Sequence, residues 1–249
     1  MVERRRSTAA DLAAAWQRNA AAWIAWARAD GHDSYWQFNR DLFFEIVPAP
    51  GRRTLDLGCG EGRVSRDLKA GGHEVVGVDL SEELLAAANE ADPSIETHLA
   101  DVAELPFPDD SFDCIVAFMS LQDVERLDDA VSEAARVLEP GGTLCIAIVH
   151  PMNSAGEFEG DDADSPFTIA GSYLEPSYYA DELERDGYSL EIVSVHRPLQ
   201  TYTAALTKAG LLTEELRETR LPDHAVTTDR MRRWQRVPLF LYLRAIKPA

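Results

Sequence analysis

Short apolar runs alternate with amphipathic stretches through the middle of the chain. Between residues 53 and 150 stand five runs rich in valine, isoleucine and leucine: RTLDLG, HEVVGVDL, IETHLA, FDCIVAF and TLCIAIVH. The spacing of apolar residues between these runs predicts helices at 62–70, 82–91 and 125–138. Because strands that alternate with helices form a mainly parallel sheet covered on both faces, the pattern predicts a doubly wound α/β fold.

The pattern continues toward both ends of the chain. Apolar and aromatic residues recur at helical spacing over 8–29 and 34–47, which predicts two helices before the core. The basic start MVERRRSTAADLAAAW is interpreted as part of a helix of a soluble protein, because charged residues break its apolar run well short of a membrane span. After the core, 197–210 predicts a helix, and 211–219 and 239–246 predict strands.

The region after His150 is polar, dotted with aromatic residues and poor in periodicity, which is typical of a functional loop. We therefore expect a helical N-terminal cap over 1–50, and a main domain over 51–249 that carries a lid insertion at about 151–196. Ser81 is the expected N-cap of the helix that follows it. The glycine pairs that begin at 71 and 141 are the expected helix exits.

Charge and composition exclude several classes of partner. The formal net charge of −19 argues against a nucleic acid, because binding to phosphates depends on lysine and arginine. The odd number of cysteines, Cys59, Cys114 and Cys145, favours reduced thiols and a cytoplasmic protein over a disulfide framework. No metal site is expected, because the acidic run at 157–164 lacks regular ligand spacing and any His or Cys partner.

The stretch LDLGCGEG at 55–62 predicts a ligand-binding turn. Its three glycines permit positive φ angles and close approach of a ligand, and the next helix offers unpaired N–H groups at its start. The dinucleotide pattern G-x-G-x-x-G would need glycine at position 63, where Arg63 stands, so NAD or FAD is the weaker interpretation. Asp56 would repel a diphosphate but would favour a cationic ligand.

Two further acidic residues follow the next strands. Asp79 ends the second strand, about twenty residues after the first glycine, where an acid in this architecture hydrogen-bonds ribose hydroxyls. Asp101 follows the third strand and is placed to accept a hydrogen bond from an adenine amino group. Together with Asp56 and the glycines, these residues describe a nucleoside that carries a charged amino-acid tail.

These segments resemble the class I S-adenosyl-L-methionine (SAM)-dependent methyltransferases, in particular the small-molecule group of the type 11 or ubiquinone-biosynthesis kind. LDLGCGEG, VVGVDLS, LADVAELPFPDDSFDCIVAFMSLQDV and EAARVLEPGGTL fall in the family's order and spacing over 53–149. The resemblance implies a Rossmann-like, seven-stranded sheet whose last two strands form an antiparallel edge, with SAM as cofactor and S-adenosyl-L-homocysteine (SAH) as product. It also implies a set of cofactor-binding residues: Asp56, Gly58, Cys59, Gly60, Gly62, Asp79, Leu80, Asp101, Val102, Ala103, Phe118 and Met119.

The expected reaction moves the methyl group of SAM to oxygen or nitrogen of a small metabolite. Such an in-line displacement needs alignment and, for some acceptors, a base. His150 ends the fifth strand at the ligand crevice and is the candidate base, with structural packing as the alternative. Other residues are candidates for contact with the substrate, although each aromatic one has packing of the cap as its alternative: Tyr35, Trp36, Gln122, Tyr173, Tyr178, Tyr179 and His196.

Two other functions stay open at this point. A SAM-binding sensor or partner subunit without turnover would keep the same cofactor motif, whereas a nicotinamide oxidoreductase would bind NAD instead. Arg40 and Arg63 are further candidates to pair with the cofactor carboxylate, with solvation at the surface as the alternative. We expect a bacterial enzyme, a monomer or homodimer, with a small-molecule acceptor and neither a membrane nor a nucleic acid as partner.

Overall fold

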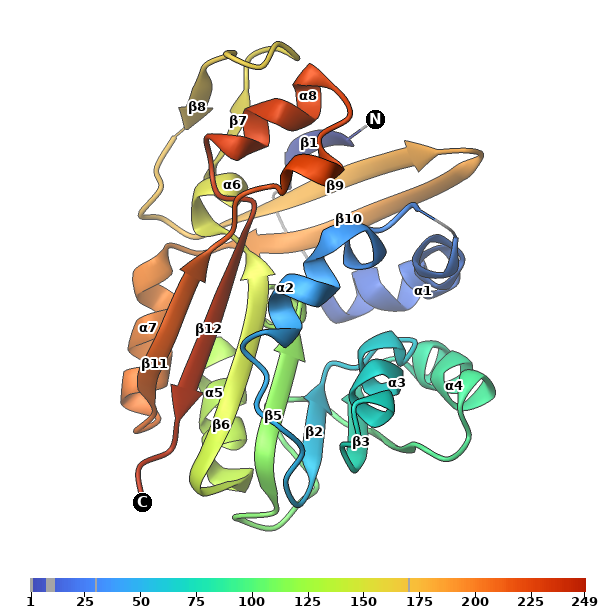
Figure 1. Ribbon diagram of the computed structural model, residues 1–249, viewed down its shortest axis with the longest axis vertical. Coiled ribbons are helices and arrows are strands. Elements are labelled where there is room, and N and C mark those ends of the chain that lie inside the picture. Colours follow the sequence, from blue (N-terminus) through green and yellow to red (C-terminus); the bar gives the residue numbers. More distant parts are fainter. Residues whose placement is uncertain (1, 8–11, 30, 170) are drawn as a thin grey trace.

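A seven-stranded sheet forms the centre of the computed structural model, which describes residues 2–7, 12–29, 31–169 and 171–249 (Figure 1). The strand order is β11-β12-β6-β5-β2-β3-β4, and β12 runs antiparallel to both of its neighbours while the other pairs are parallel. The predicted Rossmann-like sheet and its antiparallel edge are therefore confirmed. The strands are β2 (Thr54–Leu57), β3 (Val75–Asp79), β4 (Glu96–Leu99), β5 (Phe112–Phe118), β6 (Leu138–Val149), β11 (Leu212–Glu218) and β12 (Phe240–Ile246).

Helices cover both faces of this sheet, as the alternating pattern predicts. On one face, α5 (Leu127–Val137) and α7 (Leu199–Lys208) bury residues such as Val131 and Leu206 against the strands. On the other, α3 (Arg63–Ala70) and α2 (Arg40–Phe44) pack Leu68 and Phe43 into a second cluster. The remaining core helix is α4 (Glu82–Ala91), for which Ser81 is the confirmed N-cap, since its hydroxyl accepts from the N–H of Leu84 at 3.3 Å.

The two predicted N-terminal helices are present, the second with a π-helical start. They are α1 (Leu12–Arg28) and η1 (Tyr35–Asn39), which continues directly into α2. Residues 8–11 of the predicted first helix lie outside the described residues. The helix predicted for the very start of the chain is wrong, because Val2–Ser7 form strand β1 and pair antiparallel with β9 (Ser177–Arg185). A strand partner from a distant part of the chain here overrides local helical preference.

The insertion at 151–196 is mostly ordered secondary structure rather than irregular loop. It contains α6 (Pro151–Ala155), β7 (Gly156–Phe158), β8 (Phe167–Ile169), β9 and β10 (Tyr188–His196). Strands β1, β9 and β10 form a three-stranded antiparallel sheet, which we call the lid sheet, and it lies across the carboxyl ends of the parallel strands (Figure 1). The domain boundaries at residues 50 and 51 stay a prediction.

The two glycine pairs behave differently. Gly71 ends α3, and its N–H donates to the carbonyl of Asp67 at 2.9 Å, so the helix exit at 71 is confirmed. The exit predicted at Gly141 is wrong, because α5 ends at Val137 and the chain passes straight into β6. Gly141 has φ 84° where the pairing of β5 and β6 shifts register, so it serves a strand irregularity instead.

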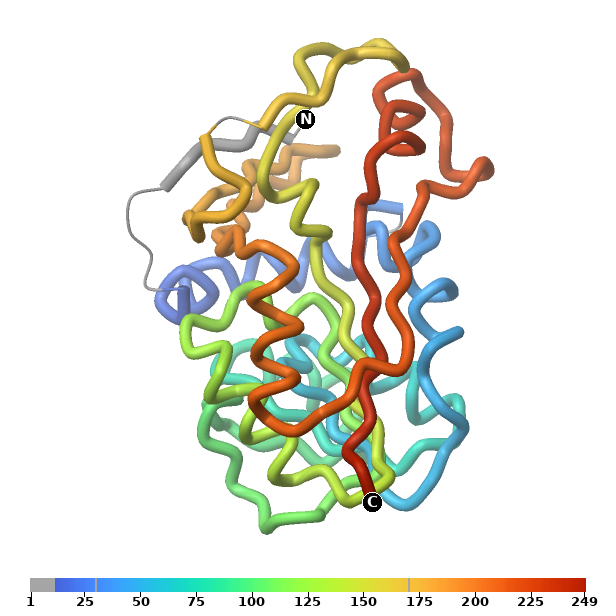
Figure 2. Tube along the Cα trace, turned by 90° about the vertical axis from the view of Figure 1, so that its left-hand side faces the viewer, coloured from blue at the N-terminus to red at the C-terminus, as the bar shows by residue number. Residues whose placement is uncertain are grey.

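Two segments outside the central sheet gather at one end of the molecule. Figure 2 shows the insertion and the segment between β11 and β12 together at the end of the molecule opposite the C-terminus. That segment holds η3 (Asp223–Ala225), α8 (Asp229–Arg232) and η4 (Arg233–Gln235).

All three cysteines are free and buried, as expected. Among the described residues, no helix has the length and apolarity needed to cross a membrane.

Candidate functional site

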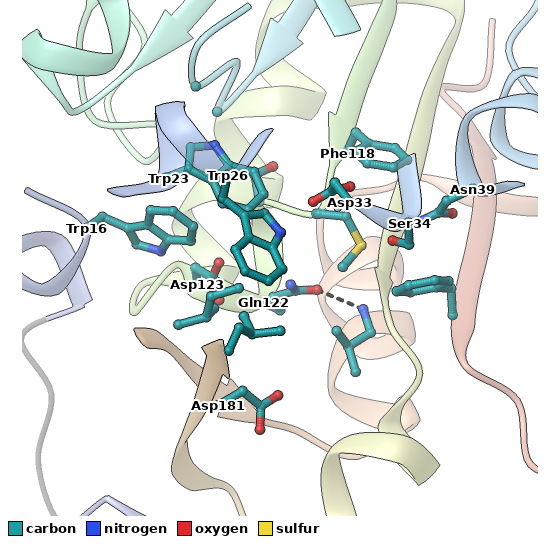
Figure 3. Close-up of a pocket in the computed structure, with 18 of the residues that line it drawn as sticks. Trp16, Trp23, Trp26, Asp33, Ser34, Asn39, Phe118, Gln122, Asp123 and Asp181 are labelled. Carbon is teal, nitrogen blue, oxygen red and sulfur yellow. Dashed lines mark hydrogen bonds between the residues drawn. The ribbon is translucent and has the colours of Figure 1, made fainter. Parts of the chain in front are cut away.

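A cavity of about 1110 Å³ lies between the lid sheet and the carboxyl ends of β2, β3 and β5 (Figure 3). Helix α1 forms one wall, because the amide of Gln17 donates to the carbonyl of Leu80 at 3.0 Å and Arg28 donates to that of Ala87 at 2.9 Å. Its apolar residues Leu12 and Ala15 pack upward against the lid sheet. The helix is thereby held between the lid and the core. The cavity is therefore lined by residues of the lid sheet, of α1 and of the central sheet.

The glycine turn forms the floor of the cavity. The N–H groups of Gly58 and Cys59 both donate to the carbonyl of Val78, at 2.8 and 2.9 Å. Gly58, Gly60 and Gly62 have φ angles of 77°, 57° and 83°, which L side chains rarely adopt. A Cβ on Gly58 would lie 2.5 Å from the Cβ of Ser120. Glycine is therefore required at position 58 both by conformation and by space.

Asp79 fastens this turn to the neighbouring helix. One carboxylate oxygen accepts from the N–H of Gly60 at 2.8 Å, and the other accepts from the N–H of Ser81 at 2.9 Å. Burial raises the pKa of Asp79, while these backbone hydrogen bonds act to lower it. The side chain also lines the cavity, where its remaining lone pairs are available to a ligand.

Asp56 lies deeper in the floor and is 1% exposed. Its carboxylate accepts a hydrogen bond from the hydroxyl of Ser65 at 2.5 Å. Burial raises the pKa of Asp56 to about 7 although that hydrogen bond opposes the shift. A cationic ligand in the cavity would stabilise the ionised carboxylate.

Most of the other expected cofactor residues also reach the cavity. Asp101, whose carboxylate accepts from the N–H of Ala103 and from Arg126, both at 2.8 Å, lies on the wall. Ala103 itself is buried behind the wall, and Gly62 caps α3 without lining the cavity. The expected residues that line the wall are Asp56, Gly58, Cys59, Gly60, Asp79, Leu80, Asp101, Val102, Phe118 and Met119.

Arg63 belongs to the cavity wall rather than to the surface. It is 7% exposed, and its guanidinium lies between the rings of Trp23 and Tyr35, 4.9 and 4.7 Å from their centroids. Asp33 pairs with it at 3.1 Å. Arg40, by contrast, pairs with Asp41 at 3.1 Å, is exposed and lies outside the wall.

The structure does not bring the predicted substrate tyrosines to the cavity. Tyr35 is fully buried beneath Arg63, and its hydroxyl donates to Asp67 at 2.7 Å. The indole of Trp36 is turned away and donates to the carbonyl of Ala27 at 3.0 Å. The insertion residues Tyr173, Tyr178, Tyr179 and His196 also lie off the wall. The ring of His196 bonds instead to Ser154 at 2.7 Å and to the carbonyl of Tyr173 at 2.9 Å.

His150 does not line the cavity, and both of its ring nitrogens are engaged. Its Nδ1 accepts from the N–H of Met152 at 2.9 Å, which caps α6, and its Nε2 lies 3.0 Å from Glu218. Because Nδ1 is an acceptor, the proton must sit on Nε2, so the ring is neutral and donates to Glu218. Burial lowers the pKa of His150. These contacts fit the alternative that His150 has a structural role, and they leave neither ring nitrogen available to take a proton from a methyl acceptor.

Comparison with known proteins assigns the family. Residues 55–146 match the family described as methyltransferase domain. Demethylmenaquinone methyltransferase of Clavibacter sepedonicus is 36% identical over 119 residues, which are 47% of this chain and 48% of that protein. The chain thus spans about half the length of the first such relatives. The 27-O-demethylrifamycin SV methyltransferase of Amycolatopsis mediterranei is 30% identical over 212 residues, 80% of this chain and 78% of that protein.

The chain belongs to the class I SAM-dependent methyltransferases. A crystal structure of such a methyltransferase from Mesorhizobium loti agrees, with a TM-score of 0.70 and 28% identity over 87% of this chain and 99% of that one. SAM is accordingly the cofactor. The site fits it, because Glu61 Oε1 is buried at the wall without a hydrogen-bond partner and Asp56 is buried in the floor. The sulfonium and the ammonium of SAM have the charge complementary to these carboxylates.

Several residues of the cavity wall were not predicted from the sequence. Of the predicted acceptor contacts, Gln122 alone lines the cavity, with its Oε1 accepting from the N–H of Val149 at 2.8 Å (Figure 3). Beside it stand Asp123 and, across the cavity, Asp181 of β9. Three indoles also face the cavity from α1: Trp16, Trp23 and Trp26. Tryptophans recurring on one face of the first predicted helix were the available signal for this wall.

Proposed function

We propose that the protein transfers the methyl group of SAM to oxygen or nitrogen of a small metabolite by in-line displacement. The cavity carries this proposal. Its volume of about 1110 Å³ exceeds the roughly 300–1,000 Å³ typical of single-ligand pockets, which supports space for a cofactor and an acceptor together. One half is the glycine turn with its acids, and the other half lies beneath the lid sheet.

The cofactor half supports a definite assignment of roles. We place the ribose hydroxyls at Asp79, the amino-acid tail at the glycine turn near Asp56, and the adenine beside Asp101 and Val102. Phe118 and Met119 then lie against the cofactor from the side of β5. Negative charge at Asp56 favours a cationic centre nearby.

The chain's contribution to the reaction is alignment and exclusion of water. When bound, SAM supplies a methyl group on a sulfonium, which leaves as a neutral thioether. The lid sheet and α1 border the cavity above the glycine turn, and the indoles of α1 line its acceptor half, which supports partial exclusion of water. Holding two reactants in line in this way removes much of the entropic barrier of a bimolecular step.

Location and acceptor size belong to the same proposal. Three free, buried thiols support a reducing compartment such as the cytoplasm. The relatives' names, which specify demethylmenaquinone and 27-O-demethylrifamycin SV, support a small-molecule acceptor here.

The test is a transfer assay with SAM that carries an isotopically labelled methyl group. The purified protein is incubated with panels of small phenols, carboxylic acids and amines, and both SAH and labelled product are measured. We expect SAH to appear only when an acceptor is present. Tight SAM binding without SAH formation across the panels would instead favour a sensor or partner subunit.

A further inference from the structure

The wall of the cavity is rich in negative charge, and Asp123 and Asp181 carry that charge into its acceptor half. Twelve acidic residues and five arginines line the part of the wall that the structure describes, and no lysine does. Electrostatic fields of this kind concentrate cations in a cleft. The net charge of −19 on the whole chain acts in the same direction.

The arginines offset only part of this charge, because five stand against twelve acids, and each already faces a carboxylate within 3.5 Å. The pairs are Arg63 with Asp33, Arg126 with Asp101, Arg185 with Asp186, Arg230 with Asp161, and Arg233 with Asp161. An anionic acceptor would have to compete with these partners. A cationic acceptor would not.

Asp123 is the wall carboxylate best placed to receive such a cation. Its Oδ1 is buried and has no hydrogen-bond partner among the described groups. Ser194 and Trp16 bond to the carboxyl, and the charge of Arg197 acts on it from behind, where that guanidinium donates to the carbonyls of Gln122 and Val124. A buried carboxylate oxygen without a donor is costly, and a donor on the ligand would remove that cost.

The surroundings of Asp123 suit an ammonium in particular. Trp16 bonds directly to Asp123 and stands edge to face with Trp23, with ring centroids 5.6 Å apart. Indole rings attract cations through their π faces. Figure 3 shows the three indoles of α1, Asp123 and Asp181 around one space.

We propose that the acceptor carries a protonated amine, that Asp123 binds it, and that nitrogen is the atom methylated. This inference rests on the proposed function. The ammonium first gives a proton to the Asp123 carboxylate, which frees the nitrogen lone pair. That pair forms the N–CH₃ bond while the S–CH₃ bond breaks, and sulfur keeps the bonding electrons as SAH. The methylammonium product leaves, and Asp123 releases its proton to water.

The ionisation of Asp123 supports this step. Burial raises the pKa of Asp123 to about 7, against the lowering effects of Ser194, Trp16 and Arg197. A carboxyl with a pKa near neutrality both takes up and releases a proton readily at physiological pH.

The experiment compares three probes that share one skeleton. Phenethylamine, 2-phenylethanol and phenylacetate are titrated calorimetrically into protein saturated with SAH. We expect phenethylamine to bind about tenfold or more tightly than the other two, as for a hydrogen bond to a charged partner. Equal binding of the alcohol or the acid, or no binding of the amine, would overturn the proposal.

Variants then locate the preference. Asp123→Asn should remove the preference for the amine and leave SAH affinity unchanged, which also reports an intact fold. Asp128→Asn, an exposed residue of α5 that pairs with Lys208 outside the cavity, is the matched control and should keep the preference. A preference that survives in Asp123→Asn would refute the assignment to Asp123. Absence of SAH binding in the unmodified protein would instead overturn the proposed function, and this inference with it.

Discussion

At the scale of single residues, buried acids set how the cavity responds to charge and pH. Asp56 is nearly inaccessible, and its pKa is raised from an ordinary 3.8 to about 7, first by burial. The folded protein therefore keeps a proton that the unfolded chain releases above pH 3.8. The stability that this proton brings is present at low pH and is lost as the pH rises through about 7.

We predict from this that SAM binds more tightly as the pH rises from about 6 to 8, by up to about tenfold per pH unit. The sulfonium and ammonium of SAM favour the ionised carboxylate of Asp56. Calorimetric titrations across this range test the slope. Asp56→Asn should flatten it, whereas Asp164→Asn, an exposed acid outside the wall, should not. A slope unchanged in Asp56→Asn would remove Asp56 from cofactor binding.

His150 gives a second prediction at this scale. His150→Ala should lower the free energy of unfolding by on the order of 1–3 kcal/mol, because it removes the cap of α6 and the contact with Glu218. Denaturant unfolding measures this loss, and calorimetry should find SAM affinity unchanged. Full stability combined with slowed turnover would return His150 to the chemistry.

At the scale of elements, the glycine turn needs both a positive φ angle and space for close packing, and two substitutions test these requirements separately. Gly58→Ala meets both a positive φ of 77° and the side chain of Ser120, whereas Gly210→Ala meets a similar φ of 79° in open space. We expect Gly210→Ala to cost about 1 kcal/mol of stability and to keep SAM binding. Gly58→Ala should cost more and should abolish SAM binding. Equal effects in calorimetry and unfolding would mean that the turn does not hold the cofactor.

The core strands could be predicted from the sequence, whereas the strands of the lid sheet could not. Strands such as β5 are buried on both faces and read as apolar runs, so the core could be predicted locally. The lid sheet could not, because four of the nine residues of β9 are charged and β1, its partner, lies near the start of the chain. The one local sign was Asp186-Gly187, whose φ angles of 51° and 85° make the tight turn between β9 and β10.

At the scale of the whole molecule, the cavity joins parts of the chain with different degrees of predictability. Asp56, Asp79 and Asp101 could be placed from sequence because parallel strands bring their carboxyl ends to one edge. The acceptor wall could not, since it depends on how α1 lies beneath the lid. Tyr35 and Trp16 are both aromatic residues on N-terminal helices, yet Trp16 alone of the two reaches the cavity.

The family match does not identify the methyl acceptor, because part of the cavity wall lies outside the matched residues. The match covers residues 55–146, whereas α1, the lid sheet and α8 lie outside it. The shared core thus accounts for cofactor binding, and the proposed acceptor contacts lie on elements outside the matched residues.

The most direct measurement is isothermal titration of the purified protein with SAM, SAH and NAD, after mass spectrometry has checked for a nucleoside that co-purifies. We predict that SAM and SAH each bind at one site per chain and that NAD does not bind. Binding of NAD in place of SAM, or of no adenosyl ligand at all, would contradict the assignment of LDLGCGEG to the cofactor and the methyl transfer built on it.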